Sequence, residues 1–304
     1  MKIMKEHPQI IVILGQTATG KSDFAVQIAK EVHGEIISAD SRQVYIGMDL
    51  GTGKITKKEM RGVPHHLLDI VKPTKVFSAN DFKKHTEKKI KEIIKRGNVP
   101  IVCGGTGFYI DTLLGSATLP EVPPNKILRA ELMKKTASEL FVLLQKLDPV
   151  RAQTIDAKNP VRLIRAIEIA KALGSVPVAQ NRGHEYEVLK IGLSLPDQIL
   201  KEKIYTRLLS RIKKGMLREI QKLHDNGVTW KRMSDLGLEY RYGALYLQKK
   251  ISKNEMIAKL NTEIWHYAKR QKTWFKRDKE IIWIDPREIH EKAKVLKKVK
   301  DFIK

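Results

Sequence analysis

One stretch of the sequence has the residue types and the spacing of a phosphate-binding loop. Residues 15–22, "GQTATGKS", match the pattern G-x-x-x-x-G-K-[ST] in full, and they lie between an apolar run and a helical pattern. Glycines let backbone N–H groups converge on an anion, and the start of the helix adds the positive end of its dipole. Lys21 adds a positive charge, and the Ser22 hydroxyl is placed to hold Mg²⁺. The loop predicts a site for a diphosphate or triphosphate, with these candidate ligands: Gly15, Thr17, Ala18, Thr19, Gly20, Lys21 and Ser22.

A carboxylate follows the second apolar strand pattern. Asp40 stands in "ISADSRQVY", directly after the segment expected to be that strand. Ligands of parallel sheets bind beyond the carboxyl ends of the strands, so Asp40 is expected to face the same crevice as Lys21. Its chemical role there would be a general base that takes a proton from an attacking nucleophile. The alternative is an aspartate that only caps a turn, and small kinases also place an acid here to hold their acceptor.

A third strand pattern, "VPIVC", ends in Gly104-Gly105-Thr106-Gly107 without a carboxylate. Proteins of this architecture that hydrolyse ATP usually carry an acid at the end of a core strand to hold the metal ion. Thr106 can contact a metal ion or a phosphate, but it cannot serve as an acid. The pattern therefore argues against hydrolysis and favours a diphosphate that is held and then released as a leaving group.

The elements that must position these residues alternate between strand and helix. Strands are expected at 10–14, 35–40, 99–105, 190–195 and 280–285, and long helices at about 197–225, 240–250 and 253–277. The alternation predicts an α/β fold: a P-loop NTPase-like core whose mainly parallel sheet is flanked by helices. Residues 127–174 have an almost wholly helical pattern. We therefore expect an all-helical insertion at 119–190, between core segments 1–118 and 191–304.

The composition indicates a polyanionic partner and a reducing compartment. The chain of 304 residues has 58 Lys and Arg against 34 Asp and Glu, a formal net charge of +24, which favours nucleic acid as a partner over a small-molecule substrate alone. A single cysteine excludes a disulfide framework within the chain. The apolar run at 10–14 is too short for a signal peptide or a membrane span, so we expect a cytoplasmic protein.

Seven blocks of the sequence together resemble one family. They are "GQTATGKS", "ISADSRQVYIGMDLGTGK", "GVPHHLLDIV", "FSANDF", "VCGGTGFYI", "NPVRLIRAIEI" and "YAKRQKTWFKR". In order and spacing they are similar to the tRNA dimethylallyltransferases (isopentenyl-tRNA transferases) in their compact bacterial form. The resemblance implies transfer of a dimethylallyl group from dimethylallyl diphosphate to the exocyclic N6 amine of the adenosine on the 3′ side of the tRNA anticodon. Pyrophosphate would leave, Mg²⁺ would assist, and the enzyme would act as a monomer without an obligate protein partner.

The resemblance also implies roles for individual residues. Asp40 would accept the amine proton, Thr106 would lie near the scissile bond, and Lys21 and Mg²⁺ on Ser22 (Thr106 being a further possible ligand) would stabilise the leaving group. Arg211, within the basic stripe Lys203, Arg207, Arg211 and Lys214, would reach the diphosphate. The expected tRNA contacts are Asp40, Ser41, Arg42, Gln43, Thr106, Arg129, Arg162, Arg165, Lys269 and Arg270.

Several of these residues have a structural alternative. Arg162 and Arg165 could be ordinary surface arginines of a helix. The aromatic residues of "YAKRQKTWF" could pack inward instead of stacking on bases, and His65 and His66 are expected to be structural. Three other functions fit parts of the pattern: a P-loop kinase for a small metabolite, a prenyltransferase for free nucleotides, and an RNA-binding protein regulated by ATP.

The chain departs from the family pattern at three places. The segment "RIKKGMLREI" is about four residues shorter than usual, "LGLEYRY" replaces a block like "IGYKE", and Ile264-Trp265 replaces a common Thr-Arg. Because the missing arginine is expected to contact tRNA, the affinity for RNA or the choice of tRNA would differ.

Overall fold

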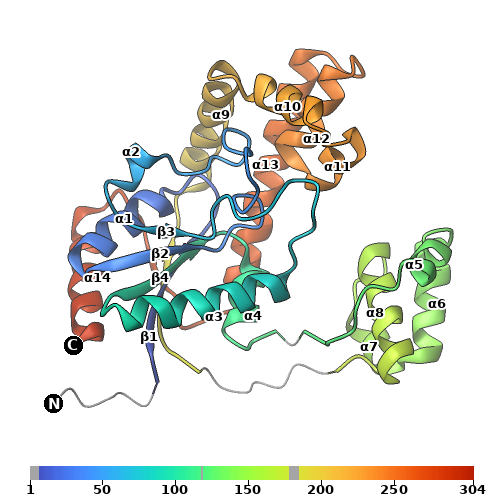
Figure 1. Ribbon diagram of the computed structural model, residues 1–304, viewed down its shortest axis with the longest axis horizontal. Coiled ribbons are helices and arrows are strands. Elements are labelled where there is room, and N and C mark those ends of the chain that lie inside the picture. The colour runs from blue at the N-terminus through green and yellow to red at the C-terminus, as the bar shows by residue number, and fades with distance from the viewer. Residues whose placement is uncertain (1–6, 118, 178–184) are drawn as a thin grey trace. The chain divides into compact units, whose positions relative to one another are not determined.

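The computed structural model describes residues 7–117, 119–177 and 185–304. It divides into a larger unit, Met1–Leu114 with Gly183–Lys304, and a smaller one, Gly115–Arg182. Strand β5 (Glu187–Leu193) belongs to the larger unit, whereas the boundary expected from the sequence lay at residue 190. Figure 1 shows a sheet with helices around it in the larger unit and helices alone in the smaller one.

Within the described residues, six parallel strands form one sheet in the order β3-β2-β4-β1-β5-β6. The order places β1 between β4 and β5, at the centre of the sheet. The side chains of residues 10–13 in β1 are 0% exposed, because helices cover both faces of the sheet. The fold class expected from the sequence is confirmed. Besides β5, the strands are β1 (Gln9–Gly15), β2 (Gly34–Ser38), β3 (His65–His66), β4 (Val99–Gly104) and β6 (Ile282–Ile284).

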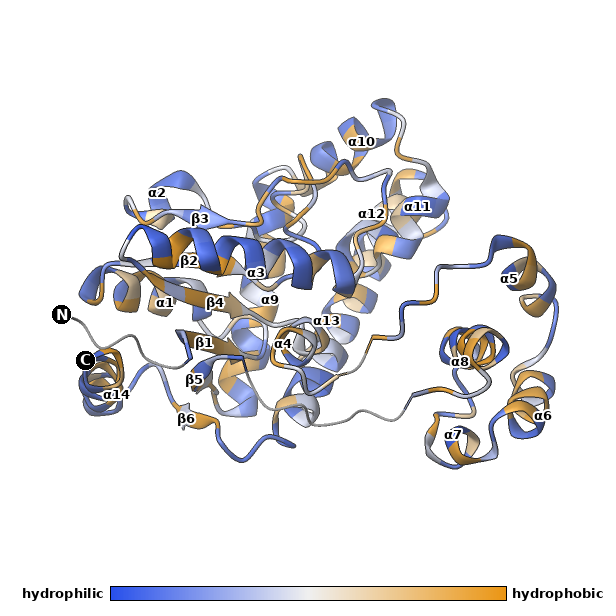
Figure 2. Cartoon of the chain, turned by 60° about the horizontal axis from the view of Figure 1, so that its bottom comes forward, coloured by the Kyte–Doolittle hydropathy of each residue, from blue (hydrophilic) through white to orange (hydrophobic). Residues whose placement is uncertain are grey.

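Two helices cover one face of the sheet, and α3 lies on the other. Helices α1 (Lys21–Glu31) and α14 (Ile289–Ile303) pack their apolar residues against β1, β4 and β5. Helix α3 (Ala79–Lys95) contacts β2 and β4 and turns its hydrophilic side outward (Figure 2). The shorter helices α2 (Lys57–Met60) and α4 (Gly107–Leu113) precede β3 and follow β4.

The second half of the larger unit is mostly helical. A second core joins its helices to Val44, Tyr45 and Met48, which follow β2, so this helical layer is packed beside the strand ends. The expected single helix over 197–225 is wrong: Gly215 has φ 105, a left-handed conformation that ends one helix and starts another. The helices are α9 (Asp197–Lys213), α10 (Met216–Asp225), α11 (Trp230–Leu236), α12 (Leu238–Leu247) and α13 (Lys253–Phe275).

The smaller unit is a helical bundle with its own apolar core, as its sequence pattern predicts. Leu140, Leu144, Leu163 and Ile167 are all 0% exposed and form the centre of this core. Its helices are α5 (Lys126–Leu132), α6 (Ala137–Leu147), α7 (Pro149–Thr154) and α8 (Pro160–Leu173). Across the described residues, no helix combines the length and the apolar character needed to cross a membrane.

Candidate active site

The predicted phosphate loop lies between β1 and α1. Gly15 has φ 136, and a Cβ atom there would lie 2.3 Å from the carbonyl oxygen of Leu193, so only glycine fits at the start of the loop. Gly20 occupies the N-cap position of α1 in a left-handed conformation, and no side chain caps the helix. The first N–H groups of α1 are therefore left without a side-chain acceptor, as a site for an anion requires.

Lys21 turns back onto the loop. Its Nζ donates a hydrogen bond to the carbonyl oxygen of Gln16. The pKa of Lys21 is lowered to about 8, mainly by burial and also by the neighbouring Arg207, while Cys103 and Asp40 oppose the shift. A bound anion would favour the charged lysine, so protonation of Lys21 and binding of a diphosphate are coupled.

Asp40 caps a turn through one of its two carboxylate oxygens. Oδ1 accepts hydrogen bonds from the backbone N–H groups of Arg42 (2.8 Å) and Gln43 (3.3 Å). Asp40 therefore does cap a turn, but the hydrogen bonds of the turn are made to Oδ1 and not to Oδ2. Asp40 also lines the pocket at the ends of β1 and β2, so its carboxylate has an acceptor to spare for a ligand.

Thr106 joins the carboxyl ends of β4 and β2. Its Oγ1 accepts a hydrogen bond from the N–H of Ser41 (3.1 Å), and its own N–H donates to the carbonyl oxygen of Ala39 (3.2 Å). These bonds place Thr106 beside the segment that carries Asp40. Among the residues that the structure describes, no group of three or more His, Cys, Asp or Glu side chains is arranged to hold a metal ion.

Two arginines of α9 have different partners. Arg207 donates through Nη2 to the hydroxyl of Thr17 in the phosphate loop at 2.7 Å. Arg211 is 8% exposed and forms an ion pair with Glu239 of α12, with 3.1 Å between Nη1 and Oε1. The structure thus brings Arg207 to the loop, whereas Arg211, the residue expected from the sequence, is engaged with a carboxylate.

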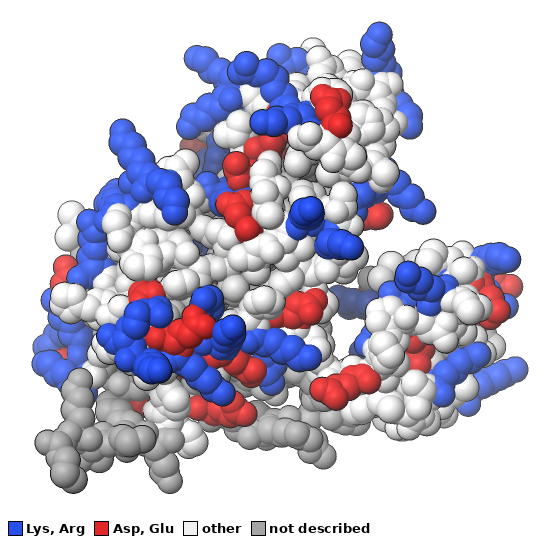
Figure 3. Space-filling model, in the orientation of Figure 1, with Lys and Arg blue, Asp and Glu red and all other residues white. Residues whose placement is uncertain are grey.

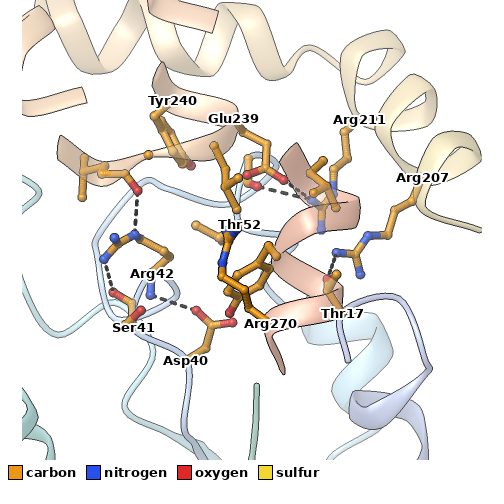
Figure 4. A pocket seen from close by; sticks show the side chains of 16 residues that line it. Thr17, Asp40, Ser41, Arg42, Thr52, Arg207, Arg211, Glu239, Tyr240 and Arg270 are labelled. Carbon is orange, nitrogen blue, oxygen red and sulfur yellow. Dashed lines mark hydrogen bonds and ion pairs between the residues drawn. The ribbon is translucent and has the colours of Figure 1, made fainter. Parts of the chain in front are cut away.

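These side chains surround a pocket in the larger unit (Figure 4). Arg42 closes one side of it, because its Nε donates to the carbonyl oxygen of Leu236 at 2.7 Å. Tyr267 and Arg270, from the "YAKRQ" segment of α13, also line it. The pocket therefore combines a phosphate-loop residue, a carboxylate and several cations. Its lining comprises Thr17, Asp40, Ser41, Arg42, Gly51, Thr52, Arg207, Arg211, residues 236–240, Ile264, Tyr267 and Arg270.

Comparison with known proteins identifies the family of this chain. The model of the IPP transferase family matches residues 43–278, well over half of the chain. The chain is 46% identical to tRNA dimethylallyltransferase 2 of Treponema denticola, covering 88% of this chain and 91% of that protein. It is 42% identical to tRNA dimethylallyltransferase 2 of Trichlorobacter lovleyi, covering 91% and 92%. The chain belongs to the IPP transferase family.

Solved structures agree as well. The tRNA isopentenylpyrophosphate transferase of Bacillus halodurans is 34% identical and superposes with a TM-score of 0.72 over 98% of both chains. A eukaryotic dimethylallyltransferase acting on tRNA has the same fold, with a TM-score of 0.81 at 24% identity over 97% of this chain and 79% of that one. The family predicted from the seven sequence blocks is thus confirmed.

In the smaller unit of this IPP transferase, two of the arginines expected to contact tRNA bind a buried carboxylate. The side chain of Glu168 is 1% exposed and accepts two hydrogen bonds from Arg129 (3.0 and 2.8 Å). Arg165 also pairs with Glu168 and donates to the carbonyl oxygen of Val122. These bonds hold the pKa of Glu168 below its usual value although burial alone would raise it. Arg129 and Arg165 therefore stabilise the bundle, while Arg162 of α8 is exposed.

On the face shown in Figure 3, Lys and Arg side chains cover more of the surface than Asp and Glu side chains do. Lys269 and Arg270 are both exposed, and the ammonium group of Lys269 lies 5.8 Å from the ring centroid of Trp265. Lys201 lies 5.0 Å from the same ring. Trp265, which replaces an arginine of the family pattern, is thus accompanied by two cations.

The aromatic residues of "YAKRQKTWF" differ in their surroundings. Phe275 is 3% exposed and belongs to the core. Trp274 packs against Gly107, where a Cβ atom would lie 2.2 Å from its ring. Tyr267 lines the pocket.

The histidine pair is structural, as expected. His65 and His66 form β3, and Nε2 of His66 lies 2.6 Å from Oε2 of the buried Glu35.

Sequence reasoning missed three residues of the site. Arg207 was visible only as one member of a basic stripe, and Glu239 stood in a block that departs from the family pattern. Gln271 was part of a quoted motif, but nothing in its neighbourhood indicated that it binds the phosphate loop, which is 254 residues away. Only contacts between distant segments reveal these roles.

Proposed function

We propose that this chain transfers the dimethylallyl group of dimethylallyl diphosphate to the N6 amine of the adenosine next to the tRNA anticodon, on its 3′ side. The observation that carries the proposal is the arrangement of the strand ends. Thr17 of the phosphate loop after β1 and the carboxylate of Asp40 after β2 border one pocket, and Arg207 of α9 donates a hydrogen bond to Thr17. Family membership supplies the identity of the donor and acceptor.

The reaction forms a bond between N6 and the first carbon of the prenyl group and breaks the bond from that carbon to the diphosphate oxygen. The electron pair of the broken bond leaves with pyrophosphate. Lys21, the N–H groups at the start of α1 and Arg207 stabilise the charge that develops there. We place Arg207 in this role because Arg211 is paired with Glu239.

The amine loses one proton as the bond forms, and Asp40 accepts it. The carboxylate oxygen that is not used in the turn is the acceptor in this proposal. Thr106 is hydrogen-bonded to Ser41, the residue after Asp40, and in this proposal it acts near the scissile bond. The adenine must leave its stack to reach this pocket, as bases do in other enzymes that modify them.

Mg²⁺ fits the donors of the loop. Magnesium in such sites is held mainly by phosphate oxygens and water with few protein ligands, and Ser22 offers an exposed hydroxyl at the start of α1. The ion would neutralise charge on the leaving diphosphate. Arg162, Lys269, Arg270 and the segment 41–43 are the proposed contacts with the tRNA, together with the overall positive charge.

The test is a transfer assay with Mg²⁺, labelled dimethylallyl diphosphate and a pool of tRNA, with free AMP and ATP alongside. We expect label in tRNA at the base beside the anticodon. Label on AMP alone would indicate a prenyltransferase for free nucleotides, and consumption of ATP without label transfer would indicate a kinase.

Replacement of Asp40 tests the proposed base. Asp40→Asn should lower the turnover number by about 10²–10⁴-fold, the usual contribution of a general base, with tRNA binding nearly unchanged. Asp225→Asn, an exposed aspartate of α10, is the matched control and should leave turnover unchanged. Full turnover in Asp40→Asn would remove Asp40 from the mechanism.

A further inference from the structure

The phosphate loop is hydrogen-bonded to α13 through a buried glutamine. Gln271 is 5% exposed, and its Oε1 accepts a hydrogen bond from the N–H of Thr17 at 2.8 Å. Its Nε2 donates to the carbonyl oxygen of Gly105, also at 2.8 Å. One amide group therefore connects the loop after β1 to the end of β4.

A second contact accompanies the first. Gln16, which is 1% exposed, donates through Nε2 to the carbonyl oxygen of Ala268, one turn before Gln271. Helix α13 thus holds the loop at two successive residues, Gln16 and Thr17. The approach at Gly105 is so close that a Cβ atom there would lie 2.3 Å from Nε2 of Gln271.

The bonds of Gln271 complete a chain across three strand ends. Arg207 donates to the hydroxyl of Thr17, and the N–H of Thr17 donates to Gln271. Gln271 donates to Gly105, whose neighbour Thr106 accepts from Ser41, the residue after Asp40. The proposed diphosphate site and the proposed base are connected through this amide. The N–H of Thr17 is therefore engaged by Gln271 and is not free to bind a phosphate.

We propose that Gln271 is a positioning residue that sets the phosphate loop against the end of β4, and so sets the donor at the correct distance from Asp40. The expected effect of Gln271 on prenyl transfer rests on the proposed function. The expected effect of Gln271 on the phosphate loop does not depend on that function. Only a group that accepts and donates at once can bond both Thr17 and Gly105. An uncharged glutamic acid meets that condition, whereas methionine and a glutamate anion do not.

Two variants of Gln271 test the proposal in the full chain. In Gln271→Met the loop loses both bonds. The turnover number should fall by about 10²-fold, the effect of a misplacement of about 1 Å, with KM for tRNA unchanged. The affinity for pyrophosphate in the presence of Mg²⁺, measured by calorimetry, should fall as well. Gln248→Met removes a glutamine at the end of α12 whose side chain donates to the carbonyl oxygen of Ala244 in that helix, and it should behave as wild type.

Gln271→Glu supplies a readout that loss of stability would not produce. Its activity relative to wild type should rise as the pH falls, because protonation restores the group that donates to Gly105. The same ratio for Gln271→Met should be independent of pH. Equal pH profiles for the two variants, or wild-type turnover in Gln271→Met, would overturn the proposal. A purely structural role would instead lower the fraction of folded protein and leave turnover per folded molecule unchanged.

The titration with pyrophosphate distinguishes failure of the proposal for Gln271 from failure of the proposed function. If wild type binds pyrophosphate without transferring a prenyl group to tRNA, the proposed function fails. The titration then still decides the role of Gln271: weakened binding in Gln271→Met supports it, and unchanged binding refutes it.

Discussion

Replacing two arginines one turn apart on α9 should produce two different defects. Arg207 donates to Thr17 of the phosphate loop, and Arg211 pairs with the buried Glu239. We therefore predict that Arg207→Met weakens diphosphate binding, whereas Arg211→Met destabilises the fold. The resemblance to the family had suggested Arg211 for the diphosphate, so the experiment decides between the two residues.

The expected loss for Arg207→Met follows from the bonds that its guanidinium would make to the diphosphate. A hydrogen bond to a charged group contributes about 1.5–3 kcal/mol. Since 1.4 kcal/mol corresponds to a factor of ten, the dissociation constant for pyrophosphate should rise about 10- to 100-fold. The free energy of unfolding without ligand should not fall. Burial, and then the charge of Arg211, hold the pKa of Arg207 at about 10, so the empty protein disfavours this charge.

The expected loss for Arg211→Met follows from the carboxylate that it leaves behind. Glu239 is 9% exposed, and burial raises its pKa while the charge of Arg211 lowers it. Removing one partner of a buried ion pair costs about 3–5 kcal/mol, because the remaining charge has lost its counter-charge. Adding Glu239→Gln to Arg211→Met removes that charge and should recover part of the loss.

For each variant, the free energy of unfolding can be measured by urea unfolding. The affinity for pyrophosphate can be measured on the same sample by calorimetric titration in the presence of Mg²⁺. Lys203→Met is the control, because Lys203 is exposed one turn earlier on the same helix. The reasoning is refuted if Arg211→Met loses affinity at unchanged stability while Arg207→Met binds pyrophosphate as wild type does.

Two further predictions concern pH. Because the pKa of Lys21 is about 8 in the empty loop and a diphosphate favours the charged amine, affinity for pyrophosphate should fall about tenfold per pH unit above 8. Titration of Lys21→Gln separates this proton from those of pyrophosphate itself, and identical pH dependence in both proteins would contradict the coupling. Burial alone would raise the pKa of Glu35, but hydrogen bonds from Arg96, Asn98 and His66 hold it at about 2, below its ordinary value of 4.5. Its contribution to the free energy of unfolding, about 3 kcal/mol at most, is therefore present above pH 4.5 and lost as the pH falls towards 2. Urea unfolding between these pH values should show a flatter profile for Glu35→Gln than for wild type, and equal slopes would exclude this role.

Much of this protein follows from local patterns in the sequence. The phosphate loop is recognisable because its glycines, Lys21 and Ser22 act within eight consecutive residues, between a strand and a helix. The fold class follows from apolar runs that alternate with helical spacing, since each pattern reflects burial on the faces of one element. The place of Asp40 follows from its position after a parallel strand, because all such strands end at the same edge of the sheet.

The tertiary structure decided which side chains meet. Arg207 and Arg211 have the same residue type and helical spacing, and only the packing of α9 against the loop and α12 gives them different partners. Arg129 and Arg165 are predicted RNA contacts, and only the structure shows that both bind Glu168, because the fold of the small bundle buries that carboxylate between them. Gln271 meets Thr17 across 254 residues of chain. A sequence pattern records the neighbours of a residue along one element, whereas these roles depend on contacts between elements that only the folded chain brings together.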